Sequence, residues 1–187
     1  MKVLIIGGVA AGTKVAAKLK RENRDYEVTI LTKSKEISYA GCGLPYYISK
    51  VIPERDQLIV NTPESFSNLT GVSVLTEVEV TKINPAEKTV VAQKTNTEET
   101  LSYEYDKLVI ATGAEAIKPP IDGVNLKNVF CLRTPDDAEN LRNAVEAGDI
   151  KRAVVVGGGY IGLEVAENLS SQGVKTTVID IAKHILP

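Results

Sequence analysis

The sequence has few cysteines and histidines and no excess of basic residues. Lys and Arg number 22 against 24 Asp and Glu, which gives a formal net charge of −2. Without a basic excess, the composition argues against nucleic-acid binding and against binding to a membrane surface. Two cysteines, Cys42 and Cys131, in 187 residues do not make a disulfide framework, which favours a reducing, cytoplasmic setting.

Long hydrophobic runs are also missing. The apolar run near the N-terminus covers residues 3–6, whereas a helix that crosses a bilayer needs about 20 apolar residues. The same run is too short for the apolar part of a secretory signal. The composition, 43% hydrophobic and 25% charged, is that of a soluble globular protein that can bury a core. We expect one domain or the beginning of two.

The N-terminal pattern predicts a strand–helix–strand unit. Residues 2–6 form an apolar run that ends at Gly7-Gly8, as a buried parallel strand does. Residues 10–21 are rich in Ala and Lys, with apolar side chains at helical spacing, and residues 27–31 read as a second buried strand. The unit has the length of a right-handed crossover.

The same pattern returns 150 residues later, from Gly7 to Gly157. Residues 153–156 predict a strand, residues 161–171 a helix, and residues 176–179 a second strand. The chain is therefore expected to be an α/β protein with two Rossmann-like dinucleotide-binding units.

The segment between the two units is less regular. We expect a helix that begins at Thr62-Pro63-Glu64, where Thr is an N-cap and Pro the first helical residue. The other expected elements are short strands at 72–75, 78–83 and 89–93, a buried strand at 108–111 and an amphipathic helix at 136–146. We place the domain boundary at Gly148-Asp149, so that residues 1–149 form the first domain and residues 150–187 begin the second.

The second glycine turn predicts an NAD(H) site. Its first glycine permits the tight turn, its second admits a pyrophosphate, and its third lets helix and strand pack closely. An acid at the end of the following strand accepts ribose hydroxyls and repels a 2′-phosphate, which favours NAD over NADP. The alternative is a structural turn that binds nothing. The predicted contacts are Gly157, Gly159, Tyr160, Ile161, Gly162 and Asp180.

The first glycine turn is less regular. Gly7 and Gly12 match the first and last glycines of the pattern, but Val9 stands at the middle position. Thr32, in place of an acid, follows the second strand. By itself this turn leaves a nucleotide site and a purely structural turn equally open.

Several segments together resemble one family. They are residues 7–12, 37–48, 105–113, 132–134 and 154–164, in the order in which that family has them. The chain resembles the pyridine nucleotide-disulfide oxidoreductases, in particular their single-cysteine branch of coenzyme A-disulfide reductases, NADH-dependent persulfide reductases and NADH oxidases. The segment around Cys42 is the most specific part of the resemblance.

The resemblance implies the family's three-layer FAD/NAD(P)-binding fold, with electrons passing from NADH through FAD and Cys42 to a disulfide or persulfide substrate. It implies no metal, and a homodimer for the full-length protein. Ser38, Lys18 and Arg21 fall where the coenzyme A-using members contact their substrate. The implied FAD contacts are Gly7, Gly8, Ala10, Ala11, Gly12, Thr32, Lys33, Val80, Ala111, Thr112 and Gly113.

Two departures from the family pattern affect the expected chemistry. Gly41 replaces the asparagine that is usual before the cysteine, and Ala10 stands where the peroxidase and water-forming oxidase members carry a histidine. The chain has one histidine, His184, expected at the surface. Thiol–disulfide or persulfide chemistry is therefore favoured over peroxide or four-electron oxygen chemistry.

The residues around Cys42 are compatible with a reactive thiol. The flanking glycines Gly41 and Gly43 give it little steric cover, and a helix with Pro45 in its first turn would lower its pKa. The alternative is a buried, inert cysteine. For Cys131 we expect a position in the core. We expect Gly148-Asp149 to be a loop and not the flavin-contacting Gly-Asp of the family.

Other functions remain open at this point. The protein is alternatively an NADH oxidase or an electron-transfer flavoprotein reductase in which Cys42 is structural, or a non-catalytic nucleotide-binding module. Pro187 precedes the family's remaining NAD-domain strands, the segment that completes the FAD domain and the dimerisation domain. We therefore expect the chain by itself to bind FAD weakly and to turn over poorly.

Overall fold

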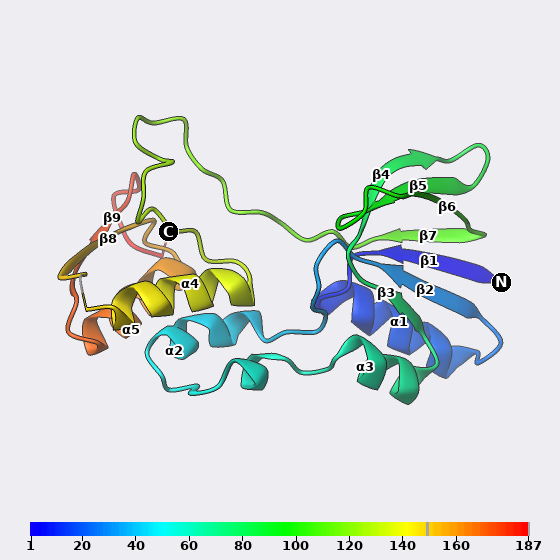
Figure 1. Ribbon diagram of the computed structural model, residues 1–187, viewed down its shortest axis with the longest axis horizontal. Coiled ribbons are helices and arrows are strands. Elements are labelled where there is room, and N and C mark those ends of the chain that lie inside the picture. The colour runs from blue at the N-terminus through cyan, green and yellow to red at the C-terminus, as the bar shows by residue number, and fades with distance from the viewer. Residues whose placement is uncertain (149, 187) are drawn as a thin grey trace. The chain divides into compact units, whose positions relative to one another are not determined.

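The computed structural model describes residues 1–148 and 150–186, which form two compact units (Figure 1). The first unit comprises residues 1–39 and 59–114, and the second comprises residues 40–58 and the described residues from 115 onwards. The chain therefore enters the second unit twice, first with the segment that carries Cys42. Asp149, at the expected domain boundary, and Pro187 lie outside the described residues, and that boundary stays a prediction.

A four-stranded parallel sheet forms the centre of the first unit. Its strands are β1 (Lys2–Ile6), β2 (Glu27–Leu31), β3 (Ser73–Leu75) and β7 (Lys107–Ile110), in the order β3-β2-β1-β7. Ile5 lies opposite Ile30 on one side and Val109 on the other. Both strands of the predicted N-terminal unit are confirmed with the expected bounds.

Two different layers cover this sheet (Figure 1). Helices α1 (Ala10–Glu22) and α3 (Pro63–Thr70) lie on one face, and the antiparallel strands β4 (Val78–Asn84), β5 (Thr89–Lys94) and β6 (Thr100–Glu104) lie on the other. Neighbouring residues of the central strands point alternately into the two cores: Ile5 packs in the helical layer and Leu4 against the antiparallel strands. The predicted α/β, Rossmann-like three-layer fold is thereby confirmed.

The second unit is built around a shorter parallel sheet. Strands β8 (Arg152–Val156) and β9 (Lys175–Ile179) pair in parallel, and α5 (Tyr160–Ser171) connects them. The unit is completed by helix α4 (Pro135–Glu146) and by three short helices, η1 (Gly41–Gly43), α2 (Leu44–Ile48) and η2 (Arg55–Leu58). Their apolar side chains share one core, to which α2, α4 and α5 all contribute. None of the helices in the described ranges is both long and apolar enough to cross a bilayer.

Several elements begin or end one residue from their predicted bounds, and other predictions differ from the structure more clearly. Strand β6 was not predicted; in it Leu101 and Tyr103 alternate with exposed residues. Helix α4 begins at Pro135, one residue earlier than expected, because Thr134 is its N-cap in a capping box with Asp137. Cys131 is only half-buried, in the loop before α4, so its predicted position in the core is wrong.

The core of the first unit predicts a clear stability difference between two apolar truncations. Ile30 is fully buried between β1 and β3, so Ile30→Ala should lower the free energy of unfolding by about 2–5 kcal/mol. Leu69, on α3, is 78% exposed, and Leu69→Ala should change it by less than about 0.5 kcal/mol. Urea unfolding of the 187-residue chain followed by circular dichroism measures both, and equal losses would contradict the described core.

Candidate functional site

The two glycine turns have the same backbone geometry. Gly7 has φ +105° and donates its N–H to the Leu31 carbonyl over 2.8 Å; Gly157 has φ +112° and donates to the Ile179 carbonyl over the same distance. Both φ values lie in the region that side chains rarely adopt, so the turns require glycine at these positions. The repeat seen in the sequence is therefore also a structural repeat.

The last glycine of each turn allows the helix to approach the strand. A β-carbon at Gly12 would lie 1.8 Å from the Gly7 carbonyl oxygen, and one at Gly162 would lie 1.9 Å from the Gly157 oxygen. The middle positions differ. Among the described residues, no neighbouring atom lies within 4 Å of the virtual β-carbon of Gly159, whereas Val9 fills the corresponding place in the first turn. The second turn therefore has the opening over its backbone that a pyrophosphate requires.

The helices that follow the two turns have uncapped N-termini. Within the described residues no side chain caps α1 after Val9 or α5 after Gly159, and neither helix has an acid in its first turn. Helices α3 and α4, in contrast, are each capped by a threonine hydroxyl. The first N–H groups of α1 and α5 can therefore donate hydrogen bonds to an anion, and the helix dipole favours a phosphate there. This arrangement fits a dinucleotide at each turn.

The predicted FAD segment after β7 lies directly beside the first turn. Ala111 donates its N–H to the Ile6 carbonyl over 2.8 Å, and a β-carbon at Gly7 would lie 2.1 Å from the Ala111 oxygen. Thr112 and Gly113 follow at the surface, and Gly113 has φ +71°. The fold thus brings together two segments that are about 100 residues apart and that the resemblance assigned to one cofactor.

The remaining predicted FAD residues surround the end of β2. Thr32 is buried and forms backbone hydrogen bonds with Leu75 and Val78. Lys33 forms an exposed ion pair with Glu79 over 3.5 Å. Val80 is half-buried at an irregularity in the pairing of β4 with β5. Their contacts with FAD stay predictions.

Asp180 closes the second turn. Its Oδ2 accepts the Gly158 N–H at 2.5 Å and its Oδ1 accepts the Ala182 N–H at 2.6 Å. The Gly158 hydrogen bond, followed by the Ala182 bond, lowers the pKa of this carboxyl below its ordinary value. A carboxylate has further lone pairs, so these bonds leave it able to accept ribose hydroxyls. Tyr160 and Ile161 are exposed at the start of α5.

The three predicted substrate residues all belong to the first unit. Lys18 and Arg21 are exposed on α1, and Lys18 pairs with Glu22 one turn further along. Ser38 has φ +49° and donates its N–H to the Gly8 carbonyl, so its backbone is fixed against the first glycine turn. Their role in substrate binding stays a prediction.

Cys42 lies in η1 of the second unit and is exposed, so it is not a buried thiol in the described structure, and its reactivity stays a prediction. Within the described structure, no atom lies within 4 Å of the virtual β-carbon of Gly41, whereas that of Gly43 would meet Ile52 and Leu58 at 3.0 Å. The predicted helix start after Cys42 is confirmed, with Pro45 in the first turn of α2. The thiol is thus open to solvent on one side and attached to a packed segment on the other.

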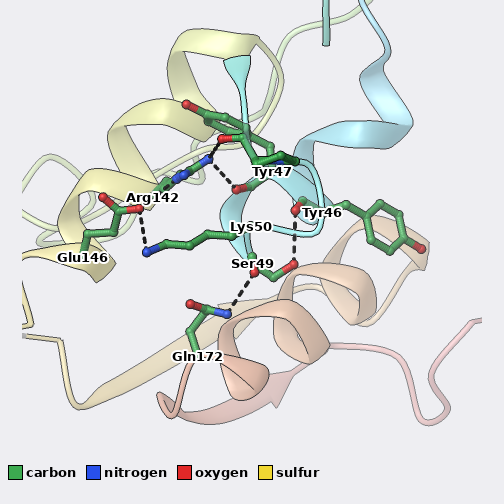
Figure 2. Close-up of polar contacts among 8 residues, drawn as sticks. Tyr46, Tyr47, Ser49, Lys50, Arg142, Glu146 and Gln172 are labelled. Carbon is green, nitrogen blue, oxygen red and sulfur yellow. Dashed lines mark hydrogen bonds and ion pairs between the residues drawn. The ribbon is translucent and has the colours of Figure 1, made fainter. Parts of the chain in front are cut away.

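Sequence analysis did not single out the residues that hold this segment in place. Ser49, at the end of α2, is buried and hydrogen-bonds to the buried Asn168 of α5, and Arg142 of α4 contacts the backbone of Tyr47 and Pro53. Figure 2 shows Arg142 and Gln172 pointing toward the α2 segment, to which Ser49 belongs. No local pattern marks these residues, because their partners lie 89 to 123 residues away in the sequence.

The two glycine turns and the exposed thiol are the features expected of a dinucleotide-binding redox protein. A family model described as pyridine nucleotide-disulphide oxidoreductase matches residues 1–187, and the chain belongs to this family. The family's members are FAD flavoproteins that use pyridine nucleotides.

Two curated relatives show the same similarity over nearly the whole chain. A protein named NADH oxidase from Methanocaldococcus jannaschii is 37% identical over 100% of this chain and 42% of its own length. A coenzyme A disulfide reductase from Staphylococcus haemolyticus is 36% identical over 95% of this chain and 40% of its own length. The chain therefore spans about two fifths of the curated relatives that it matches.

Solved structures agree over the full chain. An NAD-dependent persulfide reductase from A. fulgidus matches with a TM-score of 0.95 and 37% identity, over 100% of this chain and 35% of its own. A water-forming NADH oxidase from Lactobacillus brevis, bound to NADH, matches with a TM-score of 0.94 and 31% identity, over 100% of this chain and 41% of its own. An engineered NADPH oxidase derived from it, bound to NADPH, matches with a TM-score of 0.92 and 30% identity, over 100% of this chain and 41% of its own. One of the substitutions in that engineered enzyme replaces an aspartate with alanine.

The hydrogen bonds of Asp180 predict a titration at the second turn. The pKa of the Asp180 carboxyl lies below its ordinary value of 3.8, so the carboxylate is already largely charged at pH 3.8 and accepts the Gly158 N–H there. This hydrogen bond is lost only when a lower pH protonates the carboxylate. The amide chemical shift of Gly158 in NMR spectra of the chain should therefore titrate with a midpoint below 3.8. Asp180→Asn should remove this titration. A midpoint at or above the ordinary value would contradict the described contacts.

Proposed function

We propose that the full-length protein is an FAD-dependent reductase that uses NADH to reduce a small-molecule disulfide, persulfide or coenzyme A-disulfide through Cys42. The proposal rests on the exposed Cys42 thiol. The same chain has two glycine turns, each followed by a helix whose N-terminus has no side-chain cap among the described residues. The names of the similar proteins support it, because they include a coenzyme A disulfide reductase and a persulfide reductase.

The roles of this chain's own residues follow from their chemistry. The N–H groups that begin α1 and α5 bind pyrophosphate, and Asp180 accepts the ribose hydroxyls of NADH. The Cys42 thiolate attacks one sulfur of the substrate disulfide, forms a mixed disulfide and releases the other half as a thiol. Two electrons from NADH then reduce the mixed disulfide, which restores the thiolate and releases the second thiol. Bound FAD supplies the two-electron relay between NADH and sulfur.

Lys18 and Arg21 are the proposed contacts for a phosphate-bearing substrate such as coenzyme A. Both are exposed on α1, where an incoming anion would compete with Glu22 for the Lys18 ammonium. Ser38 is a further proposed substrate contact, with its backbone fixed by Gly8.

A second candidate function is NADH oxidase, because two similar proteins bear that name. In that case oxygen takes the electrons and no mixed disulfide forms. Ala10 stands where the oxygen-reducing members have a histidine, which favours the thiol reaction.

Replacement of Cys42 separates these functions. In the full-length protein with FAD, Cys42→Ser should reduce NADH-dependent disulfide turnover by about a thousandfold, because no nucleophile remains. Reduction of an artificial dye by NADH should be retained, since it needs no thiol. Cys131→Ser is the matched control and should keep both activities. Disulfide turnover that survives Cys42→Ser would contradict the proposal.

Nucleotide preference tests the proposed role of Asp180. In the full-length protein, Asp180→Ala should lower kcat/KM for NADH about tenfold or more, because a charged hydrogen bond to ribose is lost. The value for NADPH should rise, because the repulsion of the 2′-phosphate is removed. Asp122→Ala, at an exposed aspartate in the loop after β7, is the control and should leave both values unchanged. An unchanged preference in Asp180→Ala would assign the discrimination to other residues.

A further inference from the structure

The Cys42 thiol and Ser49 lie at opposite ends of one helical segment. Cys42 is in η1 (Gly41–Gly43), α2 (Leu44–Ile48) follows without a break, and Ser49 is the C-cap residue of α2. A short helical segment of this kind moves as one piece, because its backbone dihedral angles are fixed by hydrogen bonds. A contact that holds Ser49 therefore also restricts the movement of Cys42.

Ser49 is held by helix α5. Its hydroxyl donates to Oδ1 of Asn168, and both residues are buried, with 8% and 5% exposure. Nδ2 of Asn168 donates to the Glu164 carbonyl within α5 at 2.7 Å, which fixes the amide orientation. Nε2 of Gln172 donates to the Ser49 carbonyl at 3.0 Å (Figure 2). The Ser49 hydroxyl also lies 3.2 Å from the Tyr46 carbonyl oxygen within the same segment. Loss of this hydroxyl leaves Oδ1 of the buried Asn168 without its donor, which costs free energy.

Helix α4 holds the same segment from another side. The Arg142 guanidinium lies 4.4 Å from the centre of the Tyr47 ring and donates to the Tyr47 and Pro53 carbonyls at 3.4 and 2.7 Å. Glu146 accepts from Arg142 at 2.9 Å and pairs with Lys50 at 3.1 Å (Figure 2). These contacts are more exposed than the Ser49–Asn168 pair.

Helix α5 begins at the glycine turn of the proposed NAD(H) site. Its N-terminus follows Gly159, and Asn168 lies two turns further along the same helix. The apolar core of the second unit also joins α2 to α5, but apolar contacts have no direction and allow small shifts. The buried Ser49–Asn168 bond is directional, so it can fix the position of α2 along α5.

We propose that Ser49 and Asn168 are positioning residues that fix the Cys42 thiol to helix α5, so that the thiol and the NAD(H) turn form one rigid body. This inference rests on the proposed role of Cys42 in the reaction. The consequence is catalytic, because a shift of about 1 Å in a reacting group can reduce its rate about a hundredfold. The flavin-reduction half of the reaction does not involve the thiol and does not depend on this bond.

The test uses the full-length protein with FAD bound and compares three variants. Ser49→Ala removes the hydroxyl that bonds to Asn168, and Ser49→Thr retains a hydroxyl at the same position. Ser171→Ala is the control on the same helix, because the Ser171 hydroxyl bonds within α5, to the Asn168 carbonyl. For each protein we measure disulfide turnover, NADH-dependent dye reduction and the rates at which iodoacetamide alkylates Cys42 and Cys131.

The expected result is specific to the thiol. Ser49→Ala should lower kcat for the disulfide about tenfold and change the Cys42 alkylation rate severalfold, while KM for NADH, dye reduction and Cys131 alkylation stay at wild-type values. Ser49→Thr and Ser171→Ala should behave as wild type. A Ser49→Ala protein with wild-type Cys42 alkylation and turnover would overturn the inference. A parallel fall in dye reduction or rise in Cys131 alkylation would also overturn it, since these report general loosening.

A different measurement tests the proposed function. If Cys42→Ser retains disulfide turnover, then the thiol is not the route of electrons. The alkylation rates of Cys42 in Ser49→Ala and Ser49→Thr still decide whether the buried bond positions the thiol. The two claims are thus contradicted by different measurements.

Discussion

The close approach of a helix to the strand before it is the constraint on which both nucleotide units depend. A β-carbon at Gly12 or Gly162 would overlap the carbonyl oxygen of Gly7 or Gly157, so the first turn of each helix rests on the backbone of its glycine turn. That contact fixes how the chain passes from each turn into α1 or α5. Among the described residues, no side chain caps the first N–H groups of these two helices. The residues that permit the packing thereby also create the anion site.

The position of the cysteine segment adds a second constraint. Leu44, Tyr47 and Ile48 of α2 share a core with Leu141 of α4 and Leu169 of α5, so the segment is folded into the unit that contains the second glycine turn. Cys42 itself stays exposed at the beginning of this packed segment. Burial of one end and exposure of the other suit a reactive group, because packing limits the motion of a thiol that solvent and substrate can still reach.

The sequence predicts the features whose cause is local. The strands β1 and β2, the glycine turns and the N-cap Thr62 each follow from a few adjacent residues, and the structure contains them all. The weakly patterned strand β6 was missed, since its stabilisation comes from pairing with β5. Cys131 was placed in the core because its neighbours are apolar, but they lie in a loop where Phe130 is 36% exposed. Ser49 and Asn168, 119 residues apart, could be paired only by the fold.

The two turns show how one backbone can carry different chemistry. Both have the same φ and the same hydrogen bond to the following strand, yet a buried threonine, Thr32, follows β2 and the exposed Asp180 follows β9. The carboxylate of Asp180 bonds to the N–H of Gly158 and brings negative charge to the rim of its turn, whereas Thr32 brings none. A site with this charge discriminates against a 2′-phosphate and a site without it does not. We therefore expect the side chain after β9, and not the glycine turn itself, to set the preference of the second unit between NADH and NADPH.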